Sequence, residues 1–219
     1  MWTWCVFNGA RRMSQAVVQS HSREKVFMVV GLGNHGMSGT RHNVGMAAIN
    51  LLARRLKVAD QWKTDKRTGS DFITTKHRGM QLVLLKPRQF MNINGISVAP
   101  AAEKFHLTPE NIYLLHDELS KPLGKVSLKF GGSAKGHNGV RSCIDYLKSD
   151  TMTRLLIGIG RPDGNEKSSV TAYVLGRFTP AEQEMLPHVL EQGVDLLLLH
   201  IKNRTEMDST ANAKPLKTT

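Results

Sequence analysis

Two kinds of hydrophobic pattern alternate along the chain, one typical of strands and one typical of helices. Short apolar or alternating runs predict strands at residues 25–30, 71–76, 81–86, 111–115, 125–130 and 154–160, with a further short strand at 170–175. Apolar residues at helical spacing predict helices from about 43 to 52, from the turn after 95 to about 105, from 140 to 148, and from 180 toward 202. Because strands alternate with helices, the pattern favours an α/β fold.

Turn-forming residues mark where these elements end. His77-Arg78-Gly79 separates two strands and predicts a hairpin, and Pro87 ends its second strand. Residues 131–139 hold too many glycines for the interior of an element and open the next helix. Thr179-Pro180-Ala181-Glu182 combines an N-cap, a proline at the first helical position and a glutamate at the third, which predicts a helix start. Pro187 predicts a kink in that helix.

The chain is predicted to form one domain over residues 25–204. Its 219 residues, 40% of them hydrophobic, suffice for one sizeable core. The sequence contains no run of 18 apolar residues, the length needed to span a membrane. Residues 1–24 are predicted to be a disordered leader or a mitochondrial transit peptide, and 205–219 a disordered tail. This leader leaves a mitochondrial and a cytoplasmic location equally open.

The charge of the chain indicates a polyanionic partner. A formal net charge of +12 favours nucleic acid, with an anionic membrane surface, a solubility charge and a basic targeting segment as alternatives. Cys5 and Cys143 are the only cysteines, so they form neither a disulfide framework nor a metal knuckle.

A glycine motif near the N-terminus imitates a dinucleotide-binding fingerprint. Gly31, Gly33 and Gly36 satisfy G-x-G-x-x-G directly after a predicted strand. That motif requires a helix to begin at once, yet residues 37–40 are turn-like, and Asp60 does not end a second strand. A dinucleotide enzyme therefore stays a minor alternative, and the glycines indicate a sharp turn with room for a ligand.

Polar side chains recur where the predicted strands end. Asn34, Asn92 and Asp117 each follow a strand, Asn138 closes the glycine-rich loop, and His42 lies at the start of the helix after Asn34. Ligands of open α/β sheets bind outside the carboxyl ends of the strands, so these five side chains are expected to share one crevice. Taken singly, each of them could instead cap a helix or stabilise a turn.

This set is suited to hydrolysis without a metal ion or a cofactor. A neutral imidazole can take a proton from water, a carboxylate can orient the imidazole, and carboxamides can hold the water or an oxyanion. The sequence has no G-x-S-x-G elbow, and Cys143 lies inside a predicted helix, so water is the expected nucleophile. No H-x-x-x-H or C-x-x-C spacing indicates a metal site. His116 and His137 adjoin these residues and are assigned supporting roles.

Basic residues surround the same strand ends. Phe90 offers a ring on which a nucleic-acid base can stack. The basic residues are Lys86, Arg88, Lys125, Lys129 and Lys135. A basic cluster beside a hydrolytic set favours a nucleic acid that carries the scissile bond.

Six segments, in order, resemble the motifs of the bacterial-type peptidyl-tRNA hydrolases. They are VGLGN, TRHNVG, KPRQFMNING, HDEL, GGSAKGHNG and GIGRP. The resemblance runs from about residue 26 to 201, and the length and leader are most similar to the animal members. It implies a monomer with a mixed, twisted sheet and helices on both sides. It also implies hydrolysis of the ester between a peptide and the 3′-terminal ribose of tRNA.

The resemblance implies roles for single residues as well. His42 matches the catalytic base, Asp117 the carboxylate that orients it, and Asn34 the residue that senses an N-blocked aminoacyl group. Further matches concern contacts with tRNA, peptide or water: Phe90, Met91, Asn92, Lys129 and Asn138. The implied partners are peptidyl-tRNA and the large ribosomal subunit that carries peptidyl-tRNA.

Two positions depart from the family pattern. The loop at residues 35–39 is short and lacks the tyrosine of the bacterial members. Leu156 stands where an arginine that clamps phosphate is expected, and Arg154 could replace it only if its side chain reaches the same surface. The shortened loop keeps a second hypothesis open, a tRNA- or ribosome-binding factor without turnover.

Overall fold

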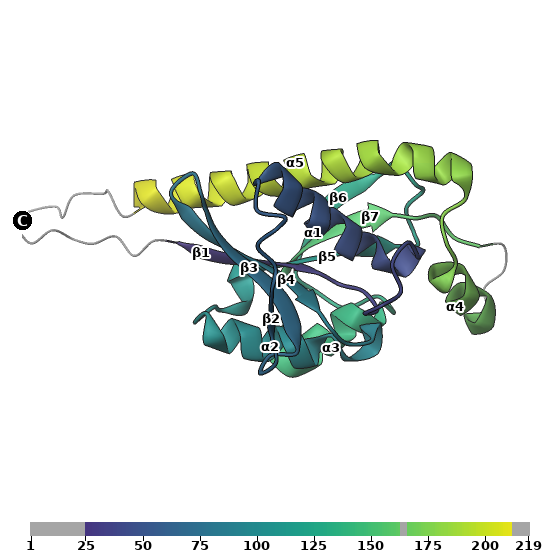
Figure 1. The fold of residues 1–219 in the computed structure, drawn as a ribbon, viewed down its shortest axis with the longest axis horizontal. Helices are drawn as coiled ribbons and strands as arrows, with labels where there is room; N and C mark the ends of the chain where they lie inside the picture. The colour runs from purple at the N-terminus through teal and green to yellow at the C-terminus, as the bar shows by residue number, and fades with distance from the viewer. Residues whose placement is uncertain (1–24, 163–165, 212–219) are drawn as a thin grey trace, which may run out of the picture.

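The computed structural model describes residues 25–162 and 166–211, which form one α/β unit around a seven-stranded mixed sheet (Figure 1). The strand order is β2-β3-β4-β1-β5-β7-β6. The strands are β1 Val26–Gly31, β2 Lys63–Asp65, β3 Ser70–His77, β4 Met80–Pro87, β5 Ile112–Glu118, β6 Val126–Phe130 and β7 Thr153–Gly158. The mixed sheet predicted from the sequence is thereby confirmed.

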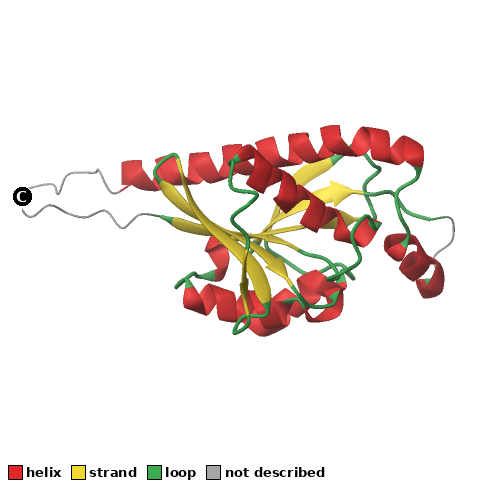
Figure 2. Ribbon diagram, in the orientation of Figure 1, coloured by secondary structure: helices red, strands yellow, loops and turns green. Residues whose placement is uncertain are grey.

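Helices cover both faces of this sheet, as expected (Figure 2). They are α1 Val44–Arg55, α2 Gly95–Lys104, α3 Asn138–Leu147, α4 Lys167–Leu175 and α5 Pro180–Ala211. Short 3-10 turns precede α1, α2 and β5: η1 Arg41–Asn43, η2 Met91–Ile93 and η3 Pro109–Asn111. Helices α1 and α5 lie on one face, and α2 and α3 lie on the other. No helix among the described residues combines the length and the apolarity needed to cross a membrane.

Alternation along β1 divides the core in two. Phe27 and Val29 pack with the apolar faces of α1 and α5, whereas Met28 and Val30 pack with α2 and α3. Successive side chains of a strand point to opposite faces, so a strand covered on both sides is apolar throughout. The continuous apolar run of β1 therefore reflects its central place in the sheet.

The pairing of the strands places four strand ends at one edge. β1 pairs in parallel with β4 and β5, and β5 pairs in parallel with β7. The carboxyl ends of these four strands therefore face the same way. β3 and β6 run antiparallel to their neighbours, and the predicted hairpin turns at Arg78-Gly79.

Two predictions from the pattern need correction. Residues 170–175 are not a strand but the second half of α4. The less exposed residues of this segment, Val170, Tyr173 and Val174, stand at the i, i+3, i+4 spacing of a helix. Helix α5 also continues to Ala211, past its expected end near Lys202 and into the predicted tail at 205–219. The Arg204 guanidinium anchors it by donating to the Glu110 carbonyl and to Asn111 Oδ1. The predicted leader, residues 1–24, lies outside the described residues.

The start of α5 follows the prediction closely. The backbone N–H of Thr179 donates to Glu182 Oε2 at 2.6 Å, and the Glu182 N–H donates back to Thr179 Oγ1 at 3.3 Å. This reciprocal pair is a capping box. The helix continues through Pro187.

Candidate active site

Close backbone packing brings α1 to the carboxyl ends of the central strands. A Cβ atom on Gly45 would lie 2.1 Å from the carbonyl oxygen of Leu115 in β5. Only glycine permits this approach, which sets the start of α1 directly against the end of β5. His42, in the turn before α1, thereby comes within reach of Asp117 in β5.

Arg41 fixes the same turn from its other side. Its guanidinium lies 2.7 Å from Glu182 Oε2 and donates to the Arg177 carbonyl at 2.6 Å. The guanidinium carbon stacks 4.3 Å from the centre of the Tyr173 ring. The turn that carries His42 is therefore held both by the sheet and by the junction of α4 and α5.

Two carboxamides clamp the backbone beyond β1. Asn43 accepts a hydrogen bond from the Asn34 N–H and donates one to the Asn34 carbonyl, at 2.7 and 2.8 Å. Asn94 makes the same pair of bonds with Gly33, both at 3.0 Å. Residues 33 and 34 are consequently held without belonging to a helix or strand.

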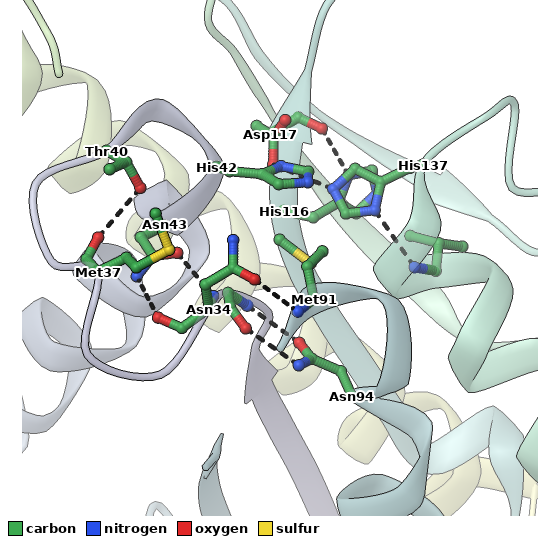
Figure 3. Close-up of polar contacts among 12 residues, drawn as sticks. Asn34, Met37, Thr40, His42, Asn43, Met91, Asn94, His116, Asp117 and His137 are labelled. Carbon is green, nitrogen blue, oxygen red and sulfur yellow. Dashed lines mark hydrogen bonds and ion pairs between the residues drawn. The ribbon is translucent and has the colours of Figure 1, made fainter. Parts of the chain in front are cut away.

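This clamp orients the side chain of Asn34. Its Oδ1 accepts a hydrogen bond from the Met91 N–H at 2.7 Å. Figure 3 shows its amide nitrogen turned toward the imidazole of His42. Asn34 therefore presents an N–H donor to the space beside His42.

Asp117 joins two imidazoles through a single oxygen. His42 Nδ1 lies 2.8 Å and His137 Nε2 lies 3.0 Å from Asp117 Oδ1 (Figure 3). All three side chains are almost completely enclosed. His137 had been assigned only a supporting role, and the structure places it in direct contact with the carboxylate.

The hydrogen bonds determine which nitrogens carry protons. His137 Nδ1 accepts from the Val140 N–H at the start of α3, so its proton lies on Nε2 and is donated to Asp117. The Nδ1–H of His42 donates to the same oxygen, which leaves His42 Nε2 as a lone-pair acceptor. Among the described residues Nε2 has no hydrogen-bond partner.

The carboxyl of Asp117 is ionised. Burial raises its pKa, but the attraction of His137 and the hydrogen bonds from His137 and His42 outweigh burial, and the net pKa is lowered. An ionised carboxylate holds the Nδ1 proton of His42 in place and stabilises the ring when it takes a second proton.

His116 is a third, neutral histidine behind the pair. Burial, aided by His137, lowers the pKa of His116 to about 3. Its Nδ1 donates to the Asp117 carbonyl at 2.7 Å, and its buried Nε2 has no partner among the described residues. His116 therefore supports the backbone at the end of β5.

The other predicted binding residues lie outside this hydrogen-bonded cluster. Phe90 is 62% exposed, and Asn92 and Asn138 are exposed as well. Met91 is buried, with its side chain packed against Gly139. Lys129 faces the glycine-rich loop, where its Nζ donates to the Ser133 carbonyl at 3.3 Å. The expected crevice thus unites Asn34, His42 and Asp117 and leaves the two outer carboxamides at its rim.

Arg154 cannot replace the arginine missing at Leu156. Only 2% of Arg154 is exposed, and its guanidinium donates to the carbonyls of Gly132 and Ser133. It fixes the glycine-rich loop from inside and does not reach the surface. Leu156 itself is buried in β7.

The structure at the glycine motif does not support dinucleotide binding. Residues 36–39 form turns, and the first helical residues begin only at Arg41. A pyrophosphate site of this kind needs a helix N-terminus directly after the glycines. Asp60 lies in a turn after α1.

The cluster also contains a set of potential metal ligands. Ligand atoms of His42, Asp117 and His137 lie within 4.8 Å of one another. Two imidazoles and a carboxylate suit a transition metal, although the shared oxygen already accepts two hydrogen bonds. Sequence spacing missed this triad because its members lie on three different elements. The clamps Asn43 and Asn94 were also missed, although both stand in the segments TRHNVG and KPRQFMNING.

Comparisons with known proteins agree on one family. The family model described as peptidyl-tRNA hydrolase matches residues 28–218. The mouse protein named probable peptidyl-tRNA hydrolase is 55% identical over 194 residues, covering 89% of this chain and 94% of that protein. The peptidyl-tRNA hydrolase of Mycobacterium tuberculosis (strain H37Rv) is 41% identical over 181 residues, covering 82% of this chain and 93% of that protein.

A solved structure gives the same result. The crystal structure of the Acinetobacter baumannii peptidyl-tRNA hydrolase superposes with a TM-score of 0.73 at 31% identity. The superposition covers 83% of this chain and 91% of the bacterial one.

Proposed function

Since the chain belongs to the peptidyl-tRNA hydrolase family, we propose that it hydrolyses the ester between a peptide and the 3′-terminal ribose of tRNA, using water activated by His42. The observation that carries this proposal is the 2.8 Å bond between His42 Nδ1 and Asp117, which leaves Nε2 as a base. Nε2 takes a proton from the attacking water, and Asp117 stabilises the resulting imidazolium.

Carboxamides at the cluster position the acyl group. The amide nitrogen of Asn34 donates to a carbonyl oxygen of the N-blocked aminoacyl group, since its Oδ1 is already occupied by Met91. Asn92 and Asn138, at the rim, hold the water and the peptide. A free aminoacyl group lacks the second carbonyl, so it makes fewer of these contacts and is spared.

The exposed residues around the cluster bind the tRNA. Phe90 provides a stacking platform for a base of the single-stranded 3′ end. Lys129 and the positive charge of the chain attract the phosphates. The monomer acts on peptidyl-tRNA released early from the ribosome or held on a stalled large subunit, and it recycles the tRNA. Translation in both the cytosol and mitochondria yields this substrate, so the proposal fits both predicted locations.

The reaction proceeds without a metal ion in this proposal. A metal on His42, Asp117 and His137 would bind His42 through Nδ1, so the ring proton would move to Nε2; this would remove both the hydrogen bond that orients His42 and the Nε2 lone pair that acts as the base. Hydrolysis should therefore be unaffected by EDTA, and added Zn²⁺ should inhibit it. Loss of activity on chelation, with recovery on adding a metal, would overturn this part of the proposal.

The decisive experiment compares N-acetyl-aminoacyl-tRNA with the same tRNA carrying a free amino group, both with EDTA present. Release of the amino acid from the blocked substrate alone supports the proposed reaction and its selectivity. Tight tRNA binding without release would instead support the binding-factor hypothesis, which the short loop at residues 35–39 motivates.

A further inference from the structure

A separate cavity lies between α1 and the start of α5, two helices that pack side by side on one face of the sheet (Figure 1). Its volume is about 410 Å³, within the range of small-molecule sites in proteins. The apolar lining consists of Val44, Ala47, Leu51, Phe178, Leu186 and Leu190. Neither His42 nor Asp117 contributes to this wall.

Two arginines give the cavity a positive charge. Arg54 and Arg177 both line it, and neither forms an ion pair with a carboxylate among the described residues. The acidic residue in the wall, Glu191, is already paired with Arg55 at 3.0 Å. An apolar cavity edged by two unpaired guanidinium groups is complementary to a ligand with an apolar body and an anionic head.

We propose that this α1–α5 cavity binds a small anionic amphiphile, with its ring or chain on the apolar lining and its carboxylate, sulfonate or phosphate on Arg177 or Arg54, which lie beside the two ends of α1. The remaining polar wall includes Thr40 and Asn43, which flank Arg41 and His42 in the sequence. The ligand would therefore contact the turn that carries His42. The proposal is independent of the hydrolytic function, and its test measures binding alone.

The test uses two fluorescent probes of the same shape, added to the full chain. One is 8-anilino-1-naphthalenesulfonate, and the other is N-phenyl-1-naphthylamine, which lacks the sulfonate. We expect one equivalent of the anionic probe to bind, with an affinity about tenfold or more above that of the neutral probe. Amide chemical shifts should change at Thr40, Leu51 and Gln183, which line the cavity.

Two kinds of variant separate the charge from the cavity. Replacing both arginines (Arg54→Gln with Arg177→Gln) should weaken the anionic probe about tenfold and leave the neutral probe unchanged. Leu186→Trp fills the cavity and should weaken both probes, and Leu51→Trp replaces it if that variant does not fold. Arg67→Gln, at an exposed arginine in the turn between β2 and β3, is the matched control and should change neither affinity.

Several results would overturn the proposal. Binding of many equivalents, or amide shifts centred on Lys129 instead of Thr40, would mean that the anionic probe only pairs with surface charge. Equal affinity for both probes would remove the role of the two arginines. A dimer that dissociates when the probe is added would show that a second copy of the chain occupies the cavity.

Discussion

His42 and His137 are enclosed and both donate a hydrogen bond to Asp117, whereas Phe90, Asn92 and Asn138 are exposed. The enclosed group acquires its geometry when the chain folds, because its partners are other parts of the same molecule. The exposed group has its polar atoms and its ring directed to solvent, where a substrate can meet them. The geometry of the catalytic group is thus preorganised in the interior, and the exposed residues are left to recognise the substrate. Substitutions in the two regions should therefore change different kinetic constants.

The largest effect is expected from His42→Ala, which removes the proposed base. The kcat for N-acetyl-aminoacyl-tRNA should fall about 10²–10⁴-fold with little change in KM, since a general base acts in the transition state. Steady-state kinetics on the folded variant measures both constants. His188→Ala, at an exposed histidine of α5, is the control and should keep full activity. A loss confined to KM would move His42 to the recognition group.

Asp117→Asn tests whether the enclosed group works as a unit. The amide cannot stabilise an imidazolium, and its nitrogen would face the donors of His42 and His137. We expect kcat to fall roughly 10²–10³-fold, again with KM nearly constant. Thermal unfolding shows how much of this is lost structure. A variant with normal kcat would mean that the carboxylate is not needed to hold His42.

The buried histidine His116 also makes the free energy of unfolding depend on pH. Because the pKa of His116 is lowered to about 3, the unfolded chain binds a proton at this site below pH 6.5 that the folded protein does not bind. The free energy of unfolding should therefore decrease as pH falls from 6.5, by about 1.4 kcal/mol per pH unit from this residue. Denaturant unfolding of His116→Gln between pH 6.5 and 4.5 should show a smaller slope than the wild type. Parallel curves would refute this assignment.

On the exposed side, Phe90→Ala should raise KM and spare kcat. Loss of one stacked base costs about 1–3 kcal/mol, which corresponds to roughly 5–150-fold in KM. Tyr146 offers an aromatic control because it is 49% exposed near the C-terminal end of α3, whereas the start of α3 faces the site. Equal effects of Phe90→Ala and Tyr146→Ala would mean that Phe90 makes no specific contact with the tRNA.

The smallest effect is expected from Lys129→Gln. Loss of one phosphate contact should reduce the slope of log affinity against log salt by about one and weaken binding modestly. Filter binding of tRNA across a salt series measures the slope. Lys63→Gln, at the β2 edge far from β6 in the sheet order, should leave the slope unchanged.

The same division explains what the sequence could predict. Strands such as β1 and β5 were identified because burial on both faces leaves a continuous apolar run. His42 and Asp117 could be selected because each stands where an apolar pattern ends. The link from Asp117 to His137 depends on how α3 packs, and no spacing in the sequence encodes it. The strand predicted at 170–175 was wrong because the less exposed residues of this segment, Val170, Tyr173 and Val174, stand at helical spacing and not in alternation.

The contact of one lysine side chain with two backbone carbonyls bears on how the protein is made. Lys25, before β1, donates to the carbonyls of Arg204 and Thr205 near the end of α5, 179 and 180 positions later. A chain growing from its N-terminus cannot form these hydrogen bonds until residue 205 has left the ribosome. Because contacts so distant in sequence form late, folding is completed only after residue 205 has emerged. An interrupted chain of this protein would thus stay incompletely folded, and would itself hang from a tRNA.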